Sequence, residues 1–362
     1  MSEFILPIIE IIIGIILLFW GGELFIQGAI TLSLTLGIPQ LVIGLTVVSL
    51  GTSSPELLVS LNSIFKGSDS IAASNVIGSN IFNILVVLGI SSLIKPLKVS
   101  GRLIRQDVPI LIAISIGVWG ISSTGFLTWQ AGIFLIFCLL ANTIWEIHTI
   151  NEKKKSTKNA DSEIEGYYDS NKGKVTILFK LISGILLLSY GSNTLVIGSQ
   201  NLAILLGINE IFIGLTIVAT GTGLPELVTS IIAASKGKTD LAIGNVIGSN
   251  MLNLLLILGT CSIFSGLKGL TIDPNLIKVD LPFMVITTFA CMATIWTKGQ
   301  ITRGEGFALL NLYIFYVLDK ILYLNDYNFL NKARIFMVIY FGLLIIFLFA
   351  QDKFKISRKK FN

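Results

Sequence analysis

The sequence predicts an all-α integral membrane protein with two inverted five-helix repeats that form a ten-helix core, plus one extra C-terminal helix. Three observations support this fold class: apolar runs long enough to cross a bilayer, a pattern that returns after 170 residues, and an odd number of spans in each copy. The chain is 53% hydrophobic and 13% charged, whereas soluble globular proteins average about 25% charged residues. We therefore expect the chain to lie within a lipid bilayer.

Eleven stretches are apolar enough to be interpreted as membrane-spanning helices. They lie at 5–34, 39–65, 70–94, 104–122, 127–149, 175–205, 210–235, 240–265, 276–297, 302–324 and 334–351. The polar segment between the fifth and sixth spans has mixed charge and few apolar residues, which predicts a flexible cytoplasmic linker. The expected organisation is a first membrane repeat at 1–149, the linker at 150–174, a second inverted repeat at 175–325, and an extra helix with a basic tail at 326–362.

The internal repeat determines this architecture. Adding 170 to a residue number in the first half returns the same pattern, so that Glu56 becomes Glu226 and Asn83 becomes Asn253. Each copy holds five predicted spans, and an odd number of spans makes the second copy enter the membrane from the opposite side. The two halves are therefore predicted to be inverted, while the eleventh span has no counterpart.

The basic residues predict an orientation in the cell (plasma or inner) membrane. Most lysines and arginines fall on one side if the N-terminus lies outside and the C-terminus in the cytoplasm, as the positive-inside rule requires. The formal net charge of +5 is thus explained by topology, and we expect no nucleic-acid partner. The three cysteines are isolated in apolar stretches, which indicates packing and not a metal or redox motif.

A polar run interrupts the second span and returns in the seventh. Residues 51–56 read Gly-Thr-Ser-Ser-Pro-Glu, and residues 221–226 read Gly-Thr-Gly-Leu-Pro-Glu. Proline lacks an N–H and crowds the preceding turn, so carbonyls near Ser49–Thr52 and Ala219–Thr222 are expected to lack full helical partners. An ionisable residue inside a membrane is a functional candidate by default, and Glu56 and Glu226 are a matched pair.

Polar side chains form stripes at helical spacing around these carboxylates. Their i, i+4, i+8 pattern places each set on one helix face. The stripes are Thr52, Glu56 and Ser60; Asn75, Ser79 and Asn83; and their repeats Thr222, Glu226 and Ser230, with Asn245, Ser249 and Asn253. All are hard oxygen donors, which suits Na⁺ or Ca²⁺ and argues against zinc or copper. For any single Ser, Thr or Asn, a packing role between membrane helices stays open.

Together these motifs resemble the paired alpha-repeats of the sodium/calcium exchangers, within the cation/calcium exchanger superfamily. The resemblance covers residues 20 to about 310 and rests on the two polar runs together with Gly78-Ser79-Asn80 and its repeat Gly248-Ser249-Asn250. It implies that the long first and sixth helices slide as a unit across the other eight, giving alternating access. It also implies an antiporter that exchanges Na⁺ for Ca²⁺, with calcium extrusion driven by the sodium gradient.

The resemblance also implies particular ligands. The implied calcium site comprises Glu56, Glu226 and the carbonyls of Thr52 and Thr222; one flanking sodium site comprises Thr52, Ser53, Ser249, Glu226 and the carbonyl of Ser49; the mirror site comprises Thr222, Ser79, Glu56 and the carbonyl of Ala219; and Asn83 and Asn253 line the middle. The family usually has a hydroxyl where Gly223 stands, so the mirror site is expected to lack one side-chain oxygen. Relatives with Asp in place of Asn253 are similar to potassium-dependent exchangers, so Asn253 argues against potassium transport.

Three alternative functions stay open on the sequence alone. A proton/calcium exchanger on the same fold is the nearest, because glutamates can carry protons, although a proton carrier does not need the Ser and Thr oxygens. A channel is less favoured, because inverted repeats with broken helices are typical of alternating access. An intramembrane enzyme would need a nucleophile beside a base, and the chain has a single histidine. We expect no catalytic residue, no cofactor and no protein partner, and a monomer is compatible with the sequence.

Overall fold

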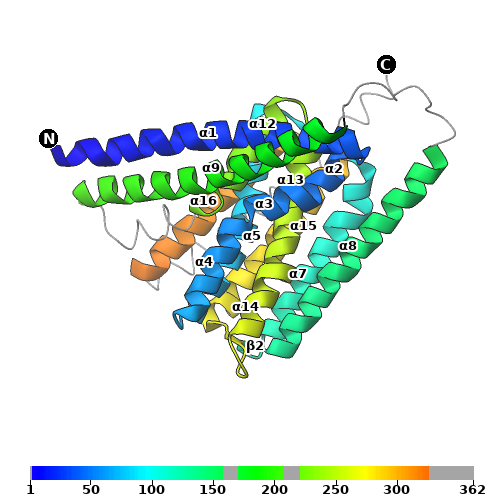
Figure 1. Ribbon diagram of the computed structural model, residues 1–362. Helices are drawn as coiled ribbons and strands as arrows, with labels where there is room; N and C mark the ends of the chain where they lie inside the picture. The colour runs from blue at the N-terminus through cyan, green and yellow to red at the C-terminus, as the bar shows by residue number, and fades with distance from the viewer. Residues whose placement is uncertain (1, 158–169, 207–220, 326–362) are drawn as a thin grey trace, which may run out of the picture.

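The structure, a computed structural model, describes residues 2–157, 170–206 and 221–325. These residues form a bundle of helices in which α1 and α9 lie side by side across one edge of the remaining helices (Figure 1). The α-helices of the first half are α1 (Ser2–Leu36), α2 (Gln40–Ile43), α3 (Ser49–Thr52), α4 (Ser54–Phe65), α5 (Asp69–Phe82), α6 (Leu88–Ile94), α7 (Val108–Ser122) and α8 (Trp129–Thr157). Those of the second half are α9 (Ser170–Leu205), α12 (Leu224–Ser235), α13 (Thr239–Leu252), α14 (Leu258–Phe264), α15 (Leu281–Lys298) and α16 (Arg303–Asn325).

Short π-helical turns and strands connect these helices. Within the described residues, the π-helical turns are η1 (Gly44–Val48), η2 (Asn83–Val87), η3 (Leu103–Asp107), η5 (Asn253–Ile257) and η6 (Leu276–Asp280). The strands, each of two residues, are β1 (Leu97–Lys98), β2 (Phe126–Leu127), β3 (Leu270–Thr271) and β4 (Gln300–Ile301). The strands depart slightly from the predicted all-α fold, because these loops satisfy their backbone groups by pairing with each other.

Within the described part of the chain, seven helices are long and apolar enough to cross a membrane, and α2 to α4 form an eighth candidate span that is bent by 43°. These eight match eight of the predicted spans. The predicted tenth span forms α16, which is not among these candidate spans; of the seventh, the structure describes only 221–235; and the eleventh, at 334–351, lies outside the described residues. The chain is therefore a multi-pass membrane protein.

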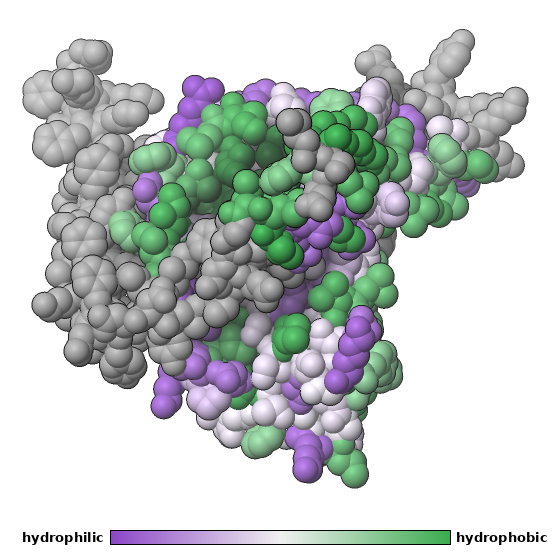
Figure 2. Space-filling model, turned by 90° about the vertical axis from the view of Figure 1, so that its left-hand side faces the viewer, coloured by the Kyte–Doolittle hydropathy of each residue, from purple (hydrophilic) through white to green (hydrophobic). Residues whose placement is uncertain are grey.

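The centre of the bundle is formed by the third span of each half, which is α5–α6 in the first half and α13–α14 in the second. In the most apolar part of α5–α6 and α13–α14, 78% and 89% of the residues are buried, compared with 22% for α1. The outer helices instead expose large apolar side chains such as Phe19 on α1 and Phe137 on α8. Figure 2 shows a broad area of hydrophobic side chains in the upper half of one face. Such exposed apolar surface suits contact with lipid.

Glycines allow α1 and α9 to pack closely. A Cβ atom added at Gly14 would lie 2.7 Å from the backbone nitrogen of Leu195, and one at Gly21 would lie 2.8 Å from that of Leu188. The equivalent glycines on α9 make the same approach to α1: a Cβ at Gly184 would lie 2.8 Å from the backbone nitrogen of Phe25. Residues further along α1 thus contact residues that come earlier in α9, from Gly14 at Leu195 to Phe25 at Gly184, so the two helices are antiparallel.

The two halves also exchange contacts in a reciprocal way. Strand β1 pairs with β4, and β2 pairs with β3, both antiparallel and both between halves. Helix α6 packs on α16 where a Cβ added at Gly306 would lie 2.7 Å from the Gly89 carbonyl, and α14 packs on α8 where a Cβ added at Gly132 would lie 2.6 Å from the Gly259 carbonyl. Each half thus holds the other at equivalent places, which brings the polar runs of the second and seventh predicted spans into one region.

The segment predicted as a linker begins and ends within helices. Helix α8 continues to Thr157 and α9 begins at Ser170, while residues 158–169 lie outside the described part of the chain. The lysine-rich residues that follow Glu152 are good helix formers, so charge alone does not end α8. The rest of the predicted linker stays a prediction.

Candidate functional site

The two polar runs break their helices at equivalent positions. Ser53 and Gly223 have nearly the same backbone angles, φ −82° and ψ 3° for the first and φ −81° and ψ 0° for the second. Pro55 and Pro225 follow within the first two positions of α4 and α12, where a missing N–H costs nothing. Each proline therefore starts a new helix and does not merely kink an existing one.

The carbonyls that the prolines free are hydrogen-bonded to serine hydroxyls. Ser54 donates to the carbonyl of Gly51 at 2.7 Å, and Ser192 on α9 donates to the carbonyl of Gly221 at 2.5 Å. The first carbonyl is thus satisfied across the break from α3 to α4, and the second by the neighbouring helix α9. The prediction was that carbonyls in these turns lack full helical partners, and at Gly51 and Gly221 a serine hydroxyl takes the place of the missing N–H.

Glu56 and Glu226 lie in the first turns of α4 and α12, where the helix dipole stabilises negative charge. Their exposed fractions are 1% and 0%, and the two carboxylates interact through charge repulsion. Two buried carboxylates in one place are unfavourable without cations or protons to balance them. The arrangement therefore favours binding of positive charge.

Hydroxyl groups from the first half bind the carboxylate of the second half. Ser53 donates to Oε1 of Glu226 at 3.0 Å. Ser249, which lies on α13 of the second half, approaches the same oxygen at 3.4 Å. The hydroxyl of Thr52 lies 3.5 Å from that of Ser249. Together these residues surround Glu226 with neutral oxygens.

The carboxylate of Glu56 has a different environment. Neither of its oxygens has a hydrogen-bond partner among the described residues, and the same is true of the buried hydroxyl of Ser79, which the resemblance assigns to the same flank. Thr222 lies close enough to interact with Glu56, but its hydroxyl donates to Oδ1 of Asn75 at 3.3 Å. Glu56 therefore lacks the hydroxyl donors that Glu226 has.

Two asparagines join the halves around the carboxylates. Asn245 accepts a hydrogen bond from Thr52 at 3.0 Å, and its amide nitrogen donates to the Ser230 hydroxyl at 3.0 Å and to the Glu226 carbonyl at 3.4 Å. Asn75 makes the equivalent bonds to Thr222, Ser60 and the Glu56 carbonyl. The predicted site omitted both asparagines, although they belong to the predicted stripes. Their role is to position the helix breaks against each other.

Asn83 and Asn253 begin the π-helical turns η2 and η5, and their exposed fractions are 1% and 0%. Neither the amide oxygen nor the amide nitrogen of either residue has a hydrogen-bond partner among the described residues. Buried polar groups are nearly always satisfied, and π-helical turns are frequent at functional sites. These side chains are thus suited to contact a bound species.

Hydrogen bonds and electrostatic interactions place some of the predicted ligands beside the carboxylates: Thr52, Ser53 and Ser249 interact with Glu226, and Thr222 interacts with Glu56. Asn83 and Asn253 begin η2 and η5, which contact the glutamate-bearing helices α12 and α4. For Ser79, Asn83 and Asn253 a role as ligands stays a prediction. The Ser49 hydroxyl donates to the Leu45 carbonyl at 2.7 Å, and the Ser49 carbonyl already accepts from the Ser53 N–H at 2.9 Å. Ala219 lies outside the described residues. The described residues contain no group of three or more His, Cys, Asp or Glu, so the donors are two carboxylates with neutral oxygens.

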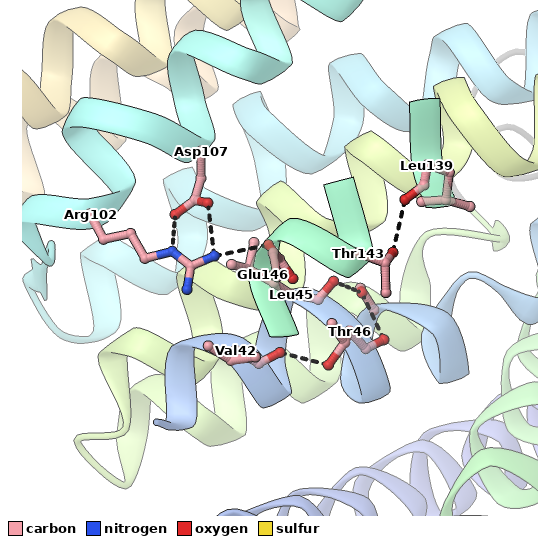
Figure 3. A network of polar contacts seen from close by, with 9 residues as sticks. Val42, Leu45, Thr46, Arg102, Asp107, Leu139, Thr143 and Glu146 are labelled. Carbon is pink, nitrogen blue, oxygen red and sulfur yellow. Dashed lines mark hydrogen bonds and ion pairs between the residues drawn. The ribbon is translucent and has the colours of Figure 1, made fainter. Parts of the chain in front are cut away.

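Acidic residues away from the site have local partners. Arg102 donates to Glu146 at 3.0 Å and forms an ion pair with Asp107 at 3.4 Å, which joins α8 to the start of α7 (Figure 3). Glu23 on α1 pairs with Lys236. Glu305 accepts from the backbone N–H of Thr302 at 2.6 Å and caps α16. These acidic residues are thus held by local contacts and do not take part in the pair Glu56 and Glu226.

The comparison with known proteins identifies the family. The family model described as "Sodium/calcium exchanger protein" matches residues 6–147 and 176–322, which include both helix breaks and both asparagine-bearing helices. The chain belongs to the sodium/calcium exchanger family. Its membership, together with the geometry of the site, identifies it as an exchanger of calcium against another cation.

Relatives of known sequence agree over nearly the full length. The inner membrane protein YrbG of Escherichia coli is 30% identical over 83% of this chain and 92% of its own length. The sodium/calcium exchanger MaX1 of Methanosarcina acetivorans is 29% identical over 84% of this chain and 95% of its own. The solved structure of the sodium-calcium exchanger NCX_Mj, soaked with Na⁺ and Ca²⁺, has a TM-score of 0.73 at 30% identity, covering 87% of this chain and 98% of that one. Family membership therefore rests on both sequence and fold.

Proposed function

We propose that the chain is a secondary-active antiporter that exchanges Na⁺ for Ca²⁺ by alternating access and extrudes calcium by using the sodium gradient. The observation that carries the proposal is the buried pair Glu56 and Glu226, of which Glu226 accepts a hydrogen bond from a hydroxyl of the opposite half. Ca²⁺ takes six to eight oxygen ligands, and two carboxylates supply up to four of them while balancing its charge. Chemical conversion is no part of this function, and we propose no enzymatic role.

Competition for the same carboxylates couples the two ions. Na⁺ is also a hard cation, and it suits the hydroxyl oxygens of Ser53 and Ser249 beside Glu226. An empty site with two negative charges resists movement past apolar helices, because exposing charge to a dry barrier is costly. A loaded site is closer to neutral and moves more readily. This difference prevents an uncoupled leak of either ion.

The proposed architecture is a ten-helix core of inverted halves with the N-terminus outside, the C-terminus in the cytoplasm, and an extra helix at 326–362. The antiparallel packing of α1 on α9 and the reciprocal contacts between halves support the inversion. In the proposed cycle, α1 and α9 move together across the other helices. We place the protein in the plasma or inner membrane, without a protein partner.

A proton/calcium exchanger is the competing function on this fold. The hydroxyl groups around Glu226 favour sodium, because proton transfer to a carboxylate requires no ring of neutral oxygens. MaX1 and NCX_Mj are both described as sodium and calcium exchangers, which supports the same choice. The cation that drives calcium movement is therefore the property to measure.

The test is uptake of radioactive calcium into proteoliposomes that contain the purified full-length chain. An outward sodium gradient at clamped pH is expected to drive uptake, and an outward proton gradient without sodium is expected to drive none. The reverse result would establish proton coupling instead. Glu56→Gln should lose uptake in the same assay while still inserting in the membrane, and Glu10→Gln on the edge of α1 serves as the matched control.

A further inference from the structure

The two halves of the site differ at one matched pair of positions. Ser53 in the first half supplies the hydroxyl that donates to Glu226. Its repeat equivalent, Gly223, has no side chain to offer Glu56. The backbone angles at the two positions are nearly the same, so the glycine is not required by the backbone. Another feature must account for the missing side chain.

That feature is Phe82. A Cβ atom added at Gly223 would lie 2.7 Å from Cδ1 and 2.8 Å from Cε1 of the Phe82 ring, which is closer than van der Waals contact allows. The ring is 4% exposed, and it packs edge-on against Tyr313 with the ring centroids 5.7 Å apart. Phe82 therefore occupies the space that a serine side chain at 223 would need.

The repeat shows that the apolar neighbour and the residue at the helix break differ in size in opposite directions between the two halves. The equivalent of Phe82 in the second half is Leu252, just as Gly223 is the equivalent of Ser53. A smaller apolar residue accompanies the serine in one half, and a larger one accompanies the glycine in the other. The Phe82 ring therefore lies beside Gly223, at the position equivalent to the one from which the Ser53 hydroxyl reaches Glu226.

The two carboxylates therefore differ in the number of neutral oxygens around them. Glu226 receives hydroxyls from Ser53 and Ser249 at 3.0 and 3.4 Å. Glu56 interacts with the hydroxyl of Thr222, which donates to Asn75 instead, and neither oxygen of its carboxylate has a hydrogen-bond partner among the described residues. A cation beside Glu56 would meet fewer oxygens and an apolar ring. One flank of the calcium position is therefore built for sodium and the other is not.

We propose that this exchanger binds one Na⁺ at the Glu226 flank and one at the calcium position between the carboxylates, but none at the Glu56 flank, so that it carries two Na⁺ for each Ca²⁺. The proposal rests on sodium/calcium exchange as the proposed function. Two carboxylates are balanced equally by two Na⁺ or by one Ca²⁺, so both loaded forms carry the same charge. The exchange is then electroneutral, and membrane potential does not bias it.

The experiment measures the calcium gradient at which net flux stops. Proteoliposomes with the full-length chain receive a tenfold sodium gradient, and valinomycin with potassium sets the potential. Two Na⁺ per Ca²⁺ predicts a balancing calcium gradient of about 100-fold, unchanged by the potential. Three Na⁺ per Ca²⁺ predicts about 1,000-fold at zero potential, with a further change of about tenfold for each 60 mV, and this result would overturn the proposal. Absence of any sodium-driven flux would instead refute the proposed function.

A pair of substitutions tests the role of Phe82 itself. Gly223→Ser alone creates the clash described above, so it is combined with Phe82→Leu to copy the arrangement of Ser53 and Leu252. For the double variant, the balance point, meaning the calcium gradient at which net flux stops, is expected to depend on membrane potential and to lie near the value for three Na⁺ per Ca²⁺. Phe82→Leu alone opens space without adding an oxygen, so its balance point is expected to remain insensitive to potential. A double variant that folds, as judged by size-exclusion chromatography, and stays electroneutral would contradict the assignment to Phe82; the wild-type balance point decides the stoichiometry in either case.

Discussion

The hydroxyl of Ser53 lies 3.0 Å from the carboxylate of Glu226, and this hydrogen bond joins the helix break of one half to the acid of the other. The two residues are 173 positions apart in the chain. The proposed ion site therefore depends on the docking of the two halves.

Ser53→Ala should weaken sodium more than calcium. A hydrogen bond to a charged group contributes about 1.5–3 kcal/mol, so we expect apparent sodium affinity to fall by roughly 10- to 100-fold when the hydroxyl oxygen is lost. Calcium retains both carboxylates and should lose less. Sodium competition against bound radioactive calcium measures both affinities. Ser63→Ala, on the exposed part of the same helix, is the control, and equal effects of the two variants would refute the role of Ser53.

Ser192→Ala should impair exchange through the helix break. The variant leaves the Gly221 carbonyl without its 2.5 Å hydrogen bond, and an unsatisfied buried acceptor costs about 1–3 kcal/mol. Adding Leu224→Ser should restore activity, because Ser54 satisfies the equivalent carbonyl from that position. Initial rates of sodium-driven calcium uptake compare the variants. The explanation fails if the double variant is as slow as Ser192→Ala.

Gly248→Ala should destabilise the contact between α13 and η1. The new Cβ would lie 2.4 Å from the Leu45 carbonyl and 2.7 Å from the Ser49 hydroxyl, and overpacking of this kind costs about 1–3 kcal/mol or more. Gly117 on α7 has no atom of another residue within 4 Å of an added Cβ, among those described, so Gly117→Ala is the matched control. Thermal unfolding in detergent should show a lower midpoint only for the first variant. Equal midpoints would contradict the close packing.

Arg102→Met should destabilise the junction of α7 and α8. Asp107 and Glu146 would lose the guanidinium that lies between them (Figure 3). Removing one partner of a buried ion pair costs about 3–5 kcal/mol, and the partial exposure of Arg102 places the expected cost near the lower end. Arg105→Met changes an exposed arginine of the same turn and should have little effect. Thermal unfolding of both variants makes the comparison, and similar midpoints would show that the network contributes little to stability.

Much of the site follows from the 170-residue repeat. The offset pairs Glu56 with Glu226, and the mid-membrane glutamates with adjacent prolines predict where the helices break. Family membership and a multi-pass membrane fold were also predicted correctly from these motifs. Local sequence patterns are sufficient for these features, because a proline inside an apolar span indicates a helix break and a carboxylate there indicates a functional site.

Contacts between the halves could not be predicted in the same way. Nothing in the sequence indicates that Thr52 would bond to Asn245, or that Phe82 would fill the space beside Gly223, since both depend on how distant helices dock. The repeat does contain a signal for the second pair. Ser53 is replaced by the smaller Gly223 at the equivalent position, and Leu252 by the larger Phe82, so the two positions differ in size in opposite directions. The predicted tenth span forms the helix α16, which by length and composition is not among the candidate membrane spans of the described residues.

The most direct test of the central claim is equilibrium binding of radioactive calcium to the purified chain. The account predicts one Ca²⁺ per wild-type chain, displaced by Na⁺, and no measurable binding to folded Glu56→Gln or Glu226→Gln. Folded Glu226→Gln that binds calcium with wild-type affinity would contradict the claim that the two buried carboxylates bind the transported ions together.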